Sequence, residues 1–325
     1  MAAASHSVAK PGATASSLTR VCSTGRVHRM AYLGASSDAG GLHLQRALFD
    51  ALRDFGYVEG ENLFVERRFS EGDYDQLETL ASELATLNLD IVFVIGTQAA
   101  LAASRAISQV PVVFAAVAYP VAMGLVRSLW EPGTNRTGVA YPSDVLCRQR
   151  VQILKEMFPK AKQVAVVHNS RNAVEALMLS AIDEASVKLK LSLALKEVKS
   201  EADFEPTFEA LRHMRPDALY IIESPLNFVH RSRIVRNVSS ARLAAIYGFA
   251  EFAEAGGLMS YSFNLAEHFR ASAGFIHRIF SGAKASSLPV EVPTTYELVI
   301  NLKTARAQGL TFPQAILARA DRVIE

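Results

Sequence analysis

The chain has few cysteines, little net charge and no long apolar run. Only Cys22 and Cys147 occur among its 325 residues, too few and too far apart for a disulfide framework or a cysteine metal site. The formal net charge is +2, and Lys and Arg form no long run, which argues against a nucleic-acid-binding surface. No apolar run reaches the roughly 18 to 20 residues of a transmembrane helix. We therefore expect two free thiols, no membrane span and small solutes as partners.

Sequence motifs of catalysis are missing as well. The chain contains no G-x-G-x-x-G, no G-x-x-x-x-G-K-[ST], no G-x-S-x-G and no H-E-x-x-H. His168 and Glu223 are the nearest approach to an acid–base pair, but no nucleophile accompanies them. A single His at a strand end more often serves packing or hydrogen bonding. We predict no catalytic residue, no cofactor and no metal.

Residues 1–29 differ in composition from the rest of the chain. They are rich in Ala, Ser and Thr and contain no acidic residue. Lys10, Pro11, Arg20 and Arg26 interrupt the stretch of about 7 to 15 apolar residues that a secretory signal needs. We expect a disordered or targeting tail. An organellar transit peptide, a misassigned start codon and a simple flexible tail fit this composition equally well.

From Met30 onward, short apolar runs alternate with segments of helical period, the pattern of a parallel sheet with crossover helices. In the first half, strands are expected at 30–37, 62–70, 91–98, 110–117 and 137–142. The second half repeats this order at 163–170, 191–198, 217–224, 243–248 and 256–262. The sequence predicts an α/β protein with two doubly wound parallel-sheet lobes joined by a multi-segment hinge. We place the first lobe at 30–142, the second at 143–291, and a return to the first lobe at about 292–325.

Polar and aromatic residues gather where the predicted strands end. In "FVIGTQAALAASRA", a buried strand runs into Gly96 and Thr97 at a helix start, which offers free N–H groups but no reactive side chain. Ligands bind open parallel sheets at the carboxyl ends of the strands, so two such lobes would form a cleft. Any one of these residues could equally be a helix N-cap. The strand-end residues are Ser36, Ser37, Asp38, Thr97, Gln98, Tyr119, Tyr141, Asn169, Ser170, Glu223, Ser224, Tyr247, Phe249, Glu251, Tyr261 and Phe263.

Five longer segments carry a family resemblance. They are 52–84, 96–129 (beginning "GTQAALAASRA"), 132–139 ("PGTNRTGV"), 245–284 and 288–325. Together they resemble the ABC-transporter substrate-binding proteins of the tryptophan/tyrosine-binding type over nearly all of residues 30–325. The resemblance implies a periplasmic or extracytoplasmic, monomeric protein of the periplasmic-binding-protein-like type I fold. It would close on a small polar or aromatic, amino-acid-like solute and deliver it to ABC permease subunits in the membrane.

The same resemblance assigns roles to residues. Ser36 and Ser37, the helix start Thr97–Ala99, and Asn169 with Ser170 would hold the carboxylate and polar atoms of the ligand. Tyr247 and Tyr261 would line the interface between the lobes.

Two positions depart from the family pattern. Tyr119 stands where the family usually has the Asp of Asp-Pro-Val, and Ser224 precedes Pro225 where Asp is frequent. A carboxylate is the natural partner of a ligand ammonium, so these losses argue against a standard α-amino acid. Asp38, Glu223 or Glu251 would have to replace the missing carboxylates.

Two other functions fit an α/β fold of this kind. A cytoplasmic small-molecule sensor could use the same bilobal fold, and the lack of a recognisable signal peptide leaves that location open. Such sensors need a helix-turn-helix, of which residues 1–30 show no sign. A nucleotide-using enzyme ranks last, because no phosphate-binding loop is present.

Overall fold

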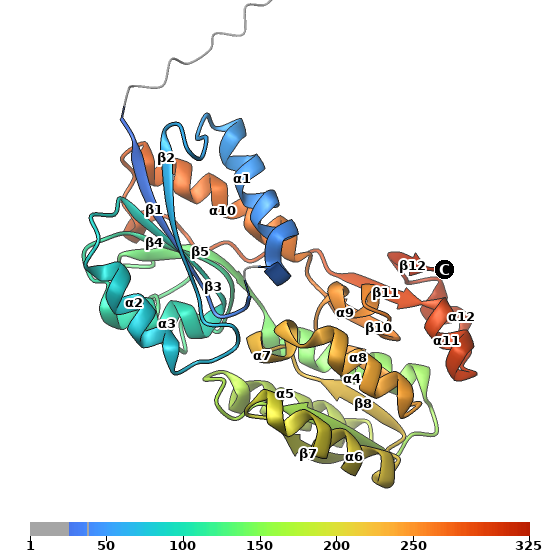
Figure 1. The fold of residues 1–325 in the computed structure, drawn as a ribbon. Helices are drawn as coiled ribbons and strands as arrows, with labels where there is room; N and C mark the ends of the chain where they lie inside the picture. Colours follow the sequence, from blue (N-terminus) through green and yellow to red (C-terminus); the bar gives the residue numbers. More distant parts are fainter. Residues whose placement is uncertain (1–25, 38) are drawn as a thin grey trace, which may run out of the picture.

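The computed structural model describes residues 26–37 and 39–325, which form two α/β lobes with their ends facing each other (Figure 1). The predictions for the tail up to residue 25, for Cys22 and for Asp38 lie outside the described residues. Cys147 is a free, buried thiol. Burial raises the pKa of this thiol to about 12, which makes it a poor nucleophile.

The first lobe is built on a five-stranded parallel sheet of order β2-β1-β3-β4-β5. Its strands are β1 (His28–Gly34), β2 (Leu63–Phe69), β3 (Ile91–Ile95), β4 (Val112–Ala118) and β5 (Arg136–Tyr141). The helices that follow three of them are α1 (Leu42–Asp54), α2 (Gln76–Ala85) and α3 (Gly96–Ala106), and a short 3-10 turn, η1 (Ala39–Gly41), precedes α1. β3 and β4 are apolar along their whole length because helices cover both faces of the sheet.

The second lobe has a seven-stranded sheet of order β12-β11-β10-β9-β8-β6-β7. Its strands are β6 (Gln163–His168), β7 (Ser192–Glu197), β8 (Ala218–Ile221), β9 (Ala245–Tyr247), β10 (Met259–Ser262), β11 (Glu297–Asn301) and β12 (Arg322–Ile324). Its helices are α4 (Ser143–Met157), α5 (Glu175–Lys188), α6 (Phe204–Met214), α7 (Pro225–Val229), α8 (Arg231–Ser240), α9 (Ala250–Glu254), α11 (Leu302–Gln308) and α12 (Gln314–Leu317), with a 3-10 turn η2 (Glu201–Asp203).

The two sheets repeat one topology. The order β7-β6-β8-β9-β10 in the second lobe matches β2-β1-β3-β4-β5 in the first, and all neighbouring pairs in both runs are parallel. The prediction of two doubly wound lobes with the same strand sequence is therefore confirmed.

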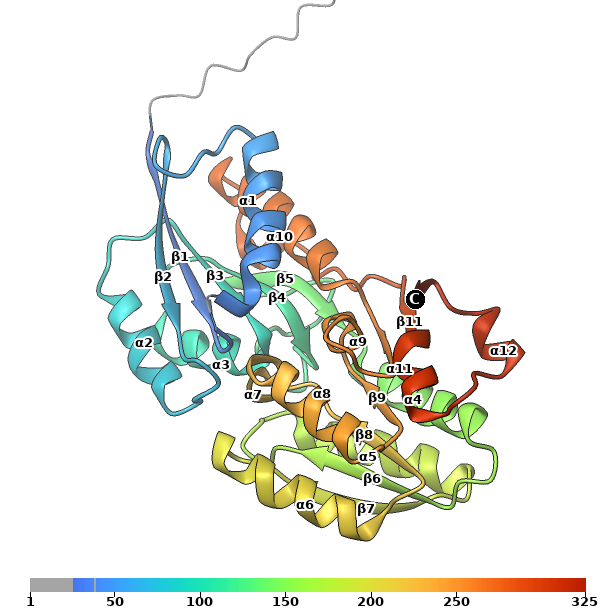
Figure 2. The ribbon, with the colours of Figure 1, turned by 45° about the vertical axis from the view of Figure 1, so that its right-hand side comes forward.

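The C-terminal segment differs from the expectation. β11 pairs antiparallel with β10, and β12 pairs with β11, so the chain from β11 to β12 belongs to the second lobe. The segment that returns to the first lobe is instead α10 (Leu265–Phe280) with the turn η3 (Ala285–Ser287) after it (Figure 2). α10 lies beside α1 because Leu265, Phe269 and Ile276 form one buried face, whereas the apolar core of β11 completes the second sheet.

The chain thus crosses between the lobes three times. It crosses after β5 at Pro142, before α10 at Asn264, and between Glu291 and β11. The rings of Tyr141 and Phe263, which flank the first two crossings, lie 4.6 Å apart. Neighbouring crossings of this kind form a hinge about which two lobes can rotate.

None of the helices in the described part of the chain is long and apolar enough to span a bilayer. Residues 26–37 and 39–325 also contain no group of three or more His, Cys, Asp or Glu placed to hold a metal ion.

Candidate ligand-binding cleft

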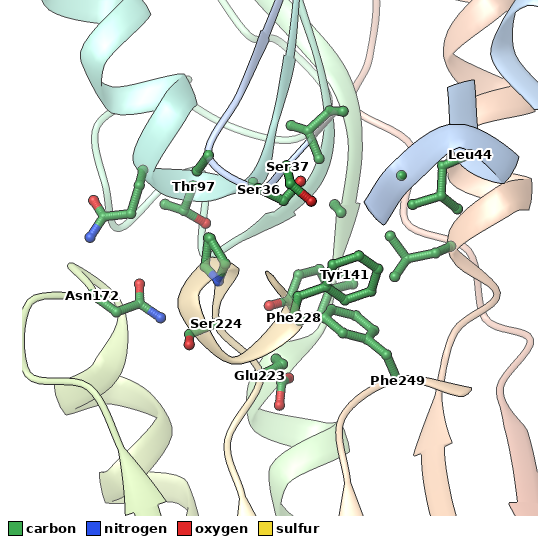
Figure 3. A pocket seen from close by; sticks show the side chains of 18 of the residues that line it. Ser36, Ser37, Leu44, Thr97, Tyr141, Asn172, Glu223, Ser224, Phe228 and Phe249 are labelled. Atoms are coloured by element: carbon green, nitrogen blue, oxygen red, sulfur yellow. The ribbon is translucent and has the colours of Figure 1, made fainter. Parts of the chain in front are cut away.

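A cavity lies between the two lobes, at the carboxyl ends of the strands of both sheets (Figure 3). It encloses about 770 Å³ of space free of protein atoms, with the open solvent at its mouth included. Ser36, Ser37 and Thr97 reach it from the first lobe, and Asn172, Glu223 and Ser224 from the second. A solute bound here would contact both lobes at once.

The wall from the first lobe contains the junction between β3 and α3. Gly96 has φ +79°, so it turns the chain sharply and α3 begins without a side-chain cap. The hydroxyl of Thr97 is already used, since it accepts from the Ala118 N–H at 3.0 Å and lies 3.3 Å from the Ala118 carbonyl. This junction therefore offers backbone N–H groups to a ligand more than it offers a side chain.

Another part of this wall is a bulge in β4. The pairing of β4 with β5 shifts register between Phe114 and Val117, and Ala116 in the bulge has φ +54°. Gly138 of β5 lies so close to Phe114 that a Cβ on Gly138 would be 2.0 Å from the Phe114 carbonyl oxygen. The bulge turns Ala116 to the cavity, an example of backbone strain beside a ligand site.

The wall from the second lobe is formed by the segments after β6 and β8. Ser224 caps α7, because its hydroxyl accepts from the Asn227 N–H at 3.1 Å, and Pro225 is the first residue of that helix. Asn172 and Val174 precede α5 and face the cavity. In Figure 3, Asn172 and Ser224 lie opposite Thr97.

Aromatic rings line one side of the cavity. Tyr141, Phe228 and Phe249 contribute to its surface. Phe263, outside the lining, packs its ring against those of Tyr141 and Phe249. The ring of Phe249 lies 5.9 Å from that of Phe228 and 5.8 Å from that of Phe263. Such rings bury an apolar or aromatic solute at a low cost in side-chain entropy.

The floor of the cleft contains a buried ion pair. Glu223 Oε2 accepts from Arg150 Nη1 at 2.6 Å, and both residues are almost completely inaccessible to solvent. Arg150 also donates to the Tyr261 carbonyl, to the Tyr220 hydroxyl and to the Gly248 carbonyl. Glu223 lines the cavity, and its Oε1 has no hydrogen-bond partner among the described residues.

Polar contacts connect the lobes around the cavity. On one side, Gln98 Nε2 donates to the Arg171 carbonyl at 2.6 Å, and the Arg171 side chain forms an ion pair with Asp75. On the other side, His43 Nε2 lies 3.2 Å from Glu251 Oε1, and Arg231 Nη2 donates to the Gly40 carbonyl at 3.3 Å. These contacts exist only while the lobes are close together.

The structure brings about half of the predicted site residues to the cavity. Those in its lining are Ser36, Ser37, Thr97, Gln98, Tyr141, Glu223, Ser224 and Phe249. Asp38 lies outside the described residues. Glu251, considered as a replacement carboxylate, lies at the rim with His43 and not in the lining.

The other predicted residues do not line the cavity. Ala99 and Tyr247 are completely buried, and the Tyr247 ring stacks on Phe252. Asn169 is buried beside Glu175, whose Oε1 accepts from its N–H at 2.7 Å, while Ser170 is exposed. Tyr119 packs against the core, and Tyr261 packs beside Tyr296, 6.1 Å between ring centres. Residues at a strand end therefore point to the core or to solvent as often as to the cleft.

Several lining residues were not predicted. They are Tyr32, Leu44, Asn172, Val174, Phe228, Leu265 and Phe269. Phe228 and Leu265 lie in the first turn of helices that follow strands, within four residues of the predicted strand ends at 224 and 262. Phe269 belongs to α10, whose return to the first lobe was not predicted.

Comparisons with known proteins agree with this geometry. A family model described as ABC transporter substrate binding protein matches residues 37–324. The "Tyrosine-binding protein" of Clostridioides difficile (strain R20291) is 25% identical over 265 residues, which cover 81% of this chain and 75% of the relative.

Two solved structures share the whole fold. A conserved domain protein from Vibrio cholerae superposes with a TM-score of 0.86 at 26% identity, and an ABC domain from Streptococcus pneumonia in complex with L-Trp superposes with 0.84 at 25% identity. Each match covers 92% of this chain and all of the other. With its bilobal fold, its interlobe cavity and a family match over nearly the whole described length, this chain belongs to the ABC transporter substrate-binding proteins.

Proposed function

We propose that the protein binds a small solute with an apolar or aromatic body in the interlobe cleft and releases it unchanged to the permease of an ABC import system. The observation that carries this proposal is the composition of the cavity. Rings from Tyr141, Phe228 and Phe249 form one side, and the rest combines aliphatic side chains with hydroxyl and amide groups from both lobes and one carboxylate from the second. This mixture of contact area and a few placed polar groups is typical of small-molecule sites.

The named relatives support an aromatic amino acid or a related compound as the solute. One is called a tyrosine-binding protein, and one was crystallised with L-Trp. The ring-lined side of the cleft suits such a body.

Hinge closure is the proposed mechanism. The three crossing segments would act as the hinge, and the rim contacts, such as the bond from Gln98 to the Arg171 carbonyl, would form on closure. A solute that contacts both walls stabilises the closed form by its differential affinity for it. We propose an extracytoplasmic, monomeric protein whose closed form docks on permease subunits in the membrane.

Native mass spectrometry of the purified protein tests whether it carries a solute. Titration calorimetry against the twenty amino acids then tests the class of solute, and X-ray scattering with and without a binding compound tests closure. We expect binding of at least one aromatic amino acid and a smaller radius of gyration when it is bound. If none of the aromatic amino acids binds, the proposed solute class is wrong. If one binds without any change in scattering, the proposed closure is wrong.

A further inference from the structure

We propose that the solute is recognised chiefly by a protonated amine that binds Glu223, and that its carboxylate, if it has one, contributes less. This inference rests on the proposed function, since it concerns the same cleft. It assigns the charge of the ligand and the residue that selects it.

Glu223 is the first observation. It is the only charged residue in the cavity lining within the described part of the chain. Its Oε2 is held by Arg150, whereas its Oε1 is buried without any partner. A buried carboxylate oxygen normally has a hydrogen-bond donor, and a ligand in the cavity that Glu223 lines could supply one. An ammonium provides both the donor and the opposite charge.

Arg150 keeps this carboxylate in place. Its guanidinium donates to four acceptors, which lie on β8, after β8, after β9 and on β10. Gly248 makes room for the pair, because a Cβ at this position would lie 2.6 Å from Glu223 Oε2. Arg150 is therefore a positioning residue, and its donors are directed to the protein rather than to a ligand carboxylate.

The anionic end of an amino acid finds weaker partners. The described residues that line the cavity include no Lys, Arg or His. Several of the polar side chains expected to hold a carboxylate already bond within the protein. The Thr97 hydroxyl bonds to Ala118, the Gln98 amide bonds to Arg171, and Ser37 Oγ accepts from the Gly40 N–H at 3.0 Å. A carboxylate is left mainly with hydroxyl and backbone N–H groups, while the amine can bond to the second oxygen of a carboxylate whose other oxygen is held by Arg150.

Matched ligands separate the two ends of an amino acid. We would measure, by titration calorimetry, tryptophan, tryptamine (no carboxylate) and indole-3-propionate (no amine), together with tyrosine, tyramine and 3-(4-hydroxyphenyl)propionate. We expect each amine to bind within about tenfold of its amino acid. Each acid without the amine should bind at least about 100-fold more weakly. Equal binding of an acid and its amino acid would overturn the inference, as would a loss of 100-fold or more for the amines.

Variants connect the effect to Glu223. Glu223→Gln keeps the shape of the side chain but removes its charge. We expect this variant to bind tryptamine at least tenfold more weakly and to bind indole-3-propionate with unchanged affinity. Glu205→Gln is the matched control and should change the binding of neither compound, because Glu205 pairs with Arg212 within α6, away from the rim and outside the lining. If Glu223→Gln fails to fold, Gly248→Ala provides a second variant, because the added methyl group displaces the Glu223 carboxylate. It should also weaken the binding of tryptamine more than that of indole-3-propionate. Equal weakening of both compounds would contradict the proposal.

The two proposals can fail separately. If indole-3-propionate binds as tightly as tryptophan, and Phe249→Ala weakens both, the aromatic cleft is correct and the assignment of Glu223 is wrong. If none of the six compounds binds, both the aromatic solute and the amine are wrong.

Discussion

Arg150 Nη1 lies 2.6 Å from Glu223 Oε2, in a position that solvent does not reach. The two residues are 73 positions apart in the chain, on α4 and directly after β8. Because α4 is the first helix after the chain crosses from the first lobe, this pair connects that crossing to the strand ends under the cleft. The stability of the second lobe and the chemistry of the cleft thus depend on the same two side chains.

Replacing Arg150 by Met should lower the free energy of unfolding by about 3 to 5 kcal/mol, because it leaves the buried Glu223 carboxylate without its counter-charge. Urea unfolding followed by circular dichroism measures this loss. The double variant Arg150→Met with Glu223→Gln removes the uncompensated charge and should recover part of the stability. If Arg150→Met is as stable as the natural chain, the ion pair between Arg150 and Glu223 does not contribute to the stability of the second lobe.

Replacing Gln98 by Ala should weaken solute binding without lowering stability. The bond from Gln98 to the Arg171 carbonyl forms only between closed lobes, so its loss disfavours closure by about 1 kcal/mol, or roughly fivefold in Kd. Calorimetry with the tightest aromatic ligand gives the Kd. Gln76→Ala is the control, since Gln76 bonds Asp73 within the first lobe and should leave the Kd unchanged. An unchanged Kd in both variants would remove Gln98 from the closure mechanism.

Phe249→Ala should weaken an aromatic solute by about 1 to 3 kcal/mol, since a large apolar contact in the cavity is lost. The ring is only partly buried, so the midpoint of thermal unfolding should fall by a few degrees at most. Phe55→Ala removes a comparable ring at the end of α1, 44% exposed and far from the lining, and serves as the control. Similar affinities for all three proteins would place the solute elsewhere.

The fold could be predicted from the sequence because its signals are periodic and local. Continuous apolar runs such as Ile91–Ile95 and Val112–Ala118, alternating with segments of helical period, indicate buried parallel strands. The location of α10 could not be predicted in the same way. The apolar face of α10, which includes Leu265 and Phe269, indicates that the helix packs against other elements, but it does not indicate which lobe they belong to. Only the assembled sheets decide that.

The site was predictable in region but not in residue. Strand ends identify the correct edge of each sheet, but whether a side chain there faces the cavity depends on local turns, such as the bulge at Ala116. The helical periodicity around Arg150 contains one further signal. It lies on the same helical face as Leu146, Cys147 and Leu154, which are buried, so a charge at this position implies a buried partner. The identity of that partner, Glu223, follows only from the three-dimensional structure.

His268 should make stability depend on pH. It is buried in α10 beside the hinge, its ring stacks 4.0 Å from Phe263, and neither ring nitrogen has a partner among the described residues. Burial lowers the pKa of His268 to about 3, against about 6.5 when unfolded, so between these values the unfolded chain binds the additional proton. The free energy of unfolding should fall by about 1.4 kcal/mol per pH unit below 6.5 from this residue alone.

His268→Phe removes the titration and keeps a ring. Comparing urea unfolding of both proteins from pH 7.5 to 4 isolates the effect, because all other groups titrate in both. If the difference in unfolding free energy between the two proteins does not change with pH, the pKa of His268 is the same in the folded and the unfolded chain, and the prediction is wrong.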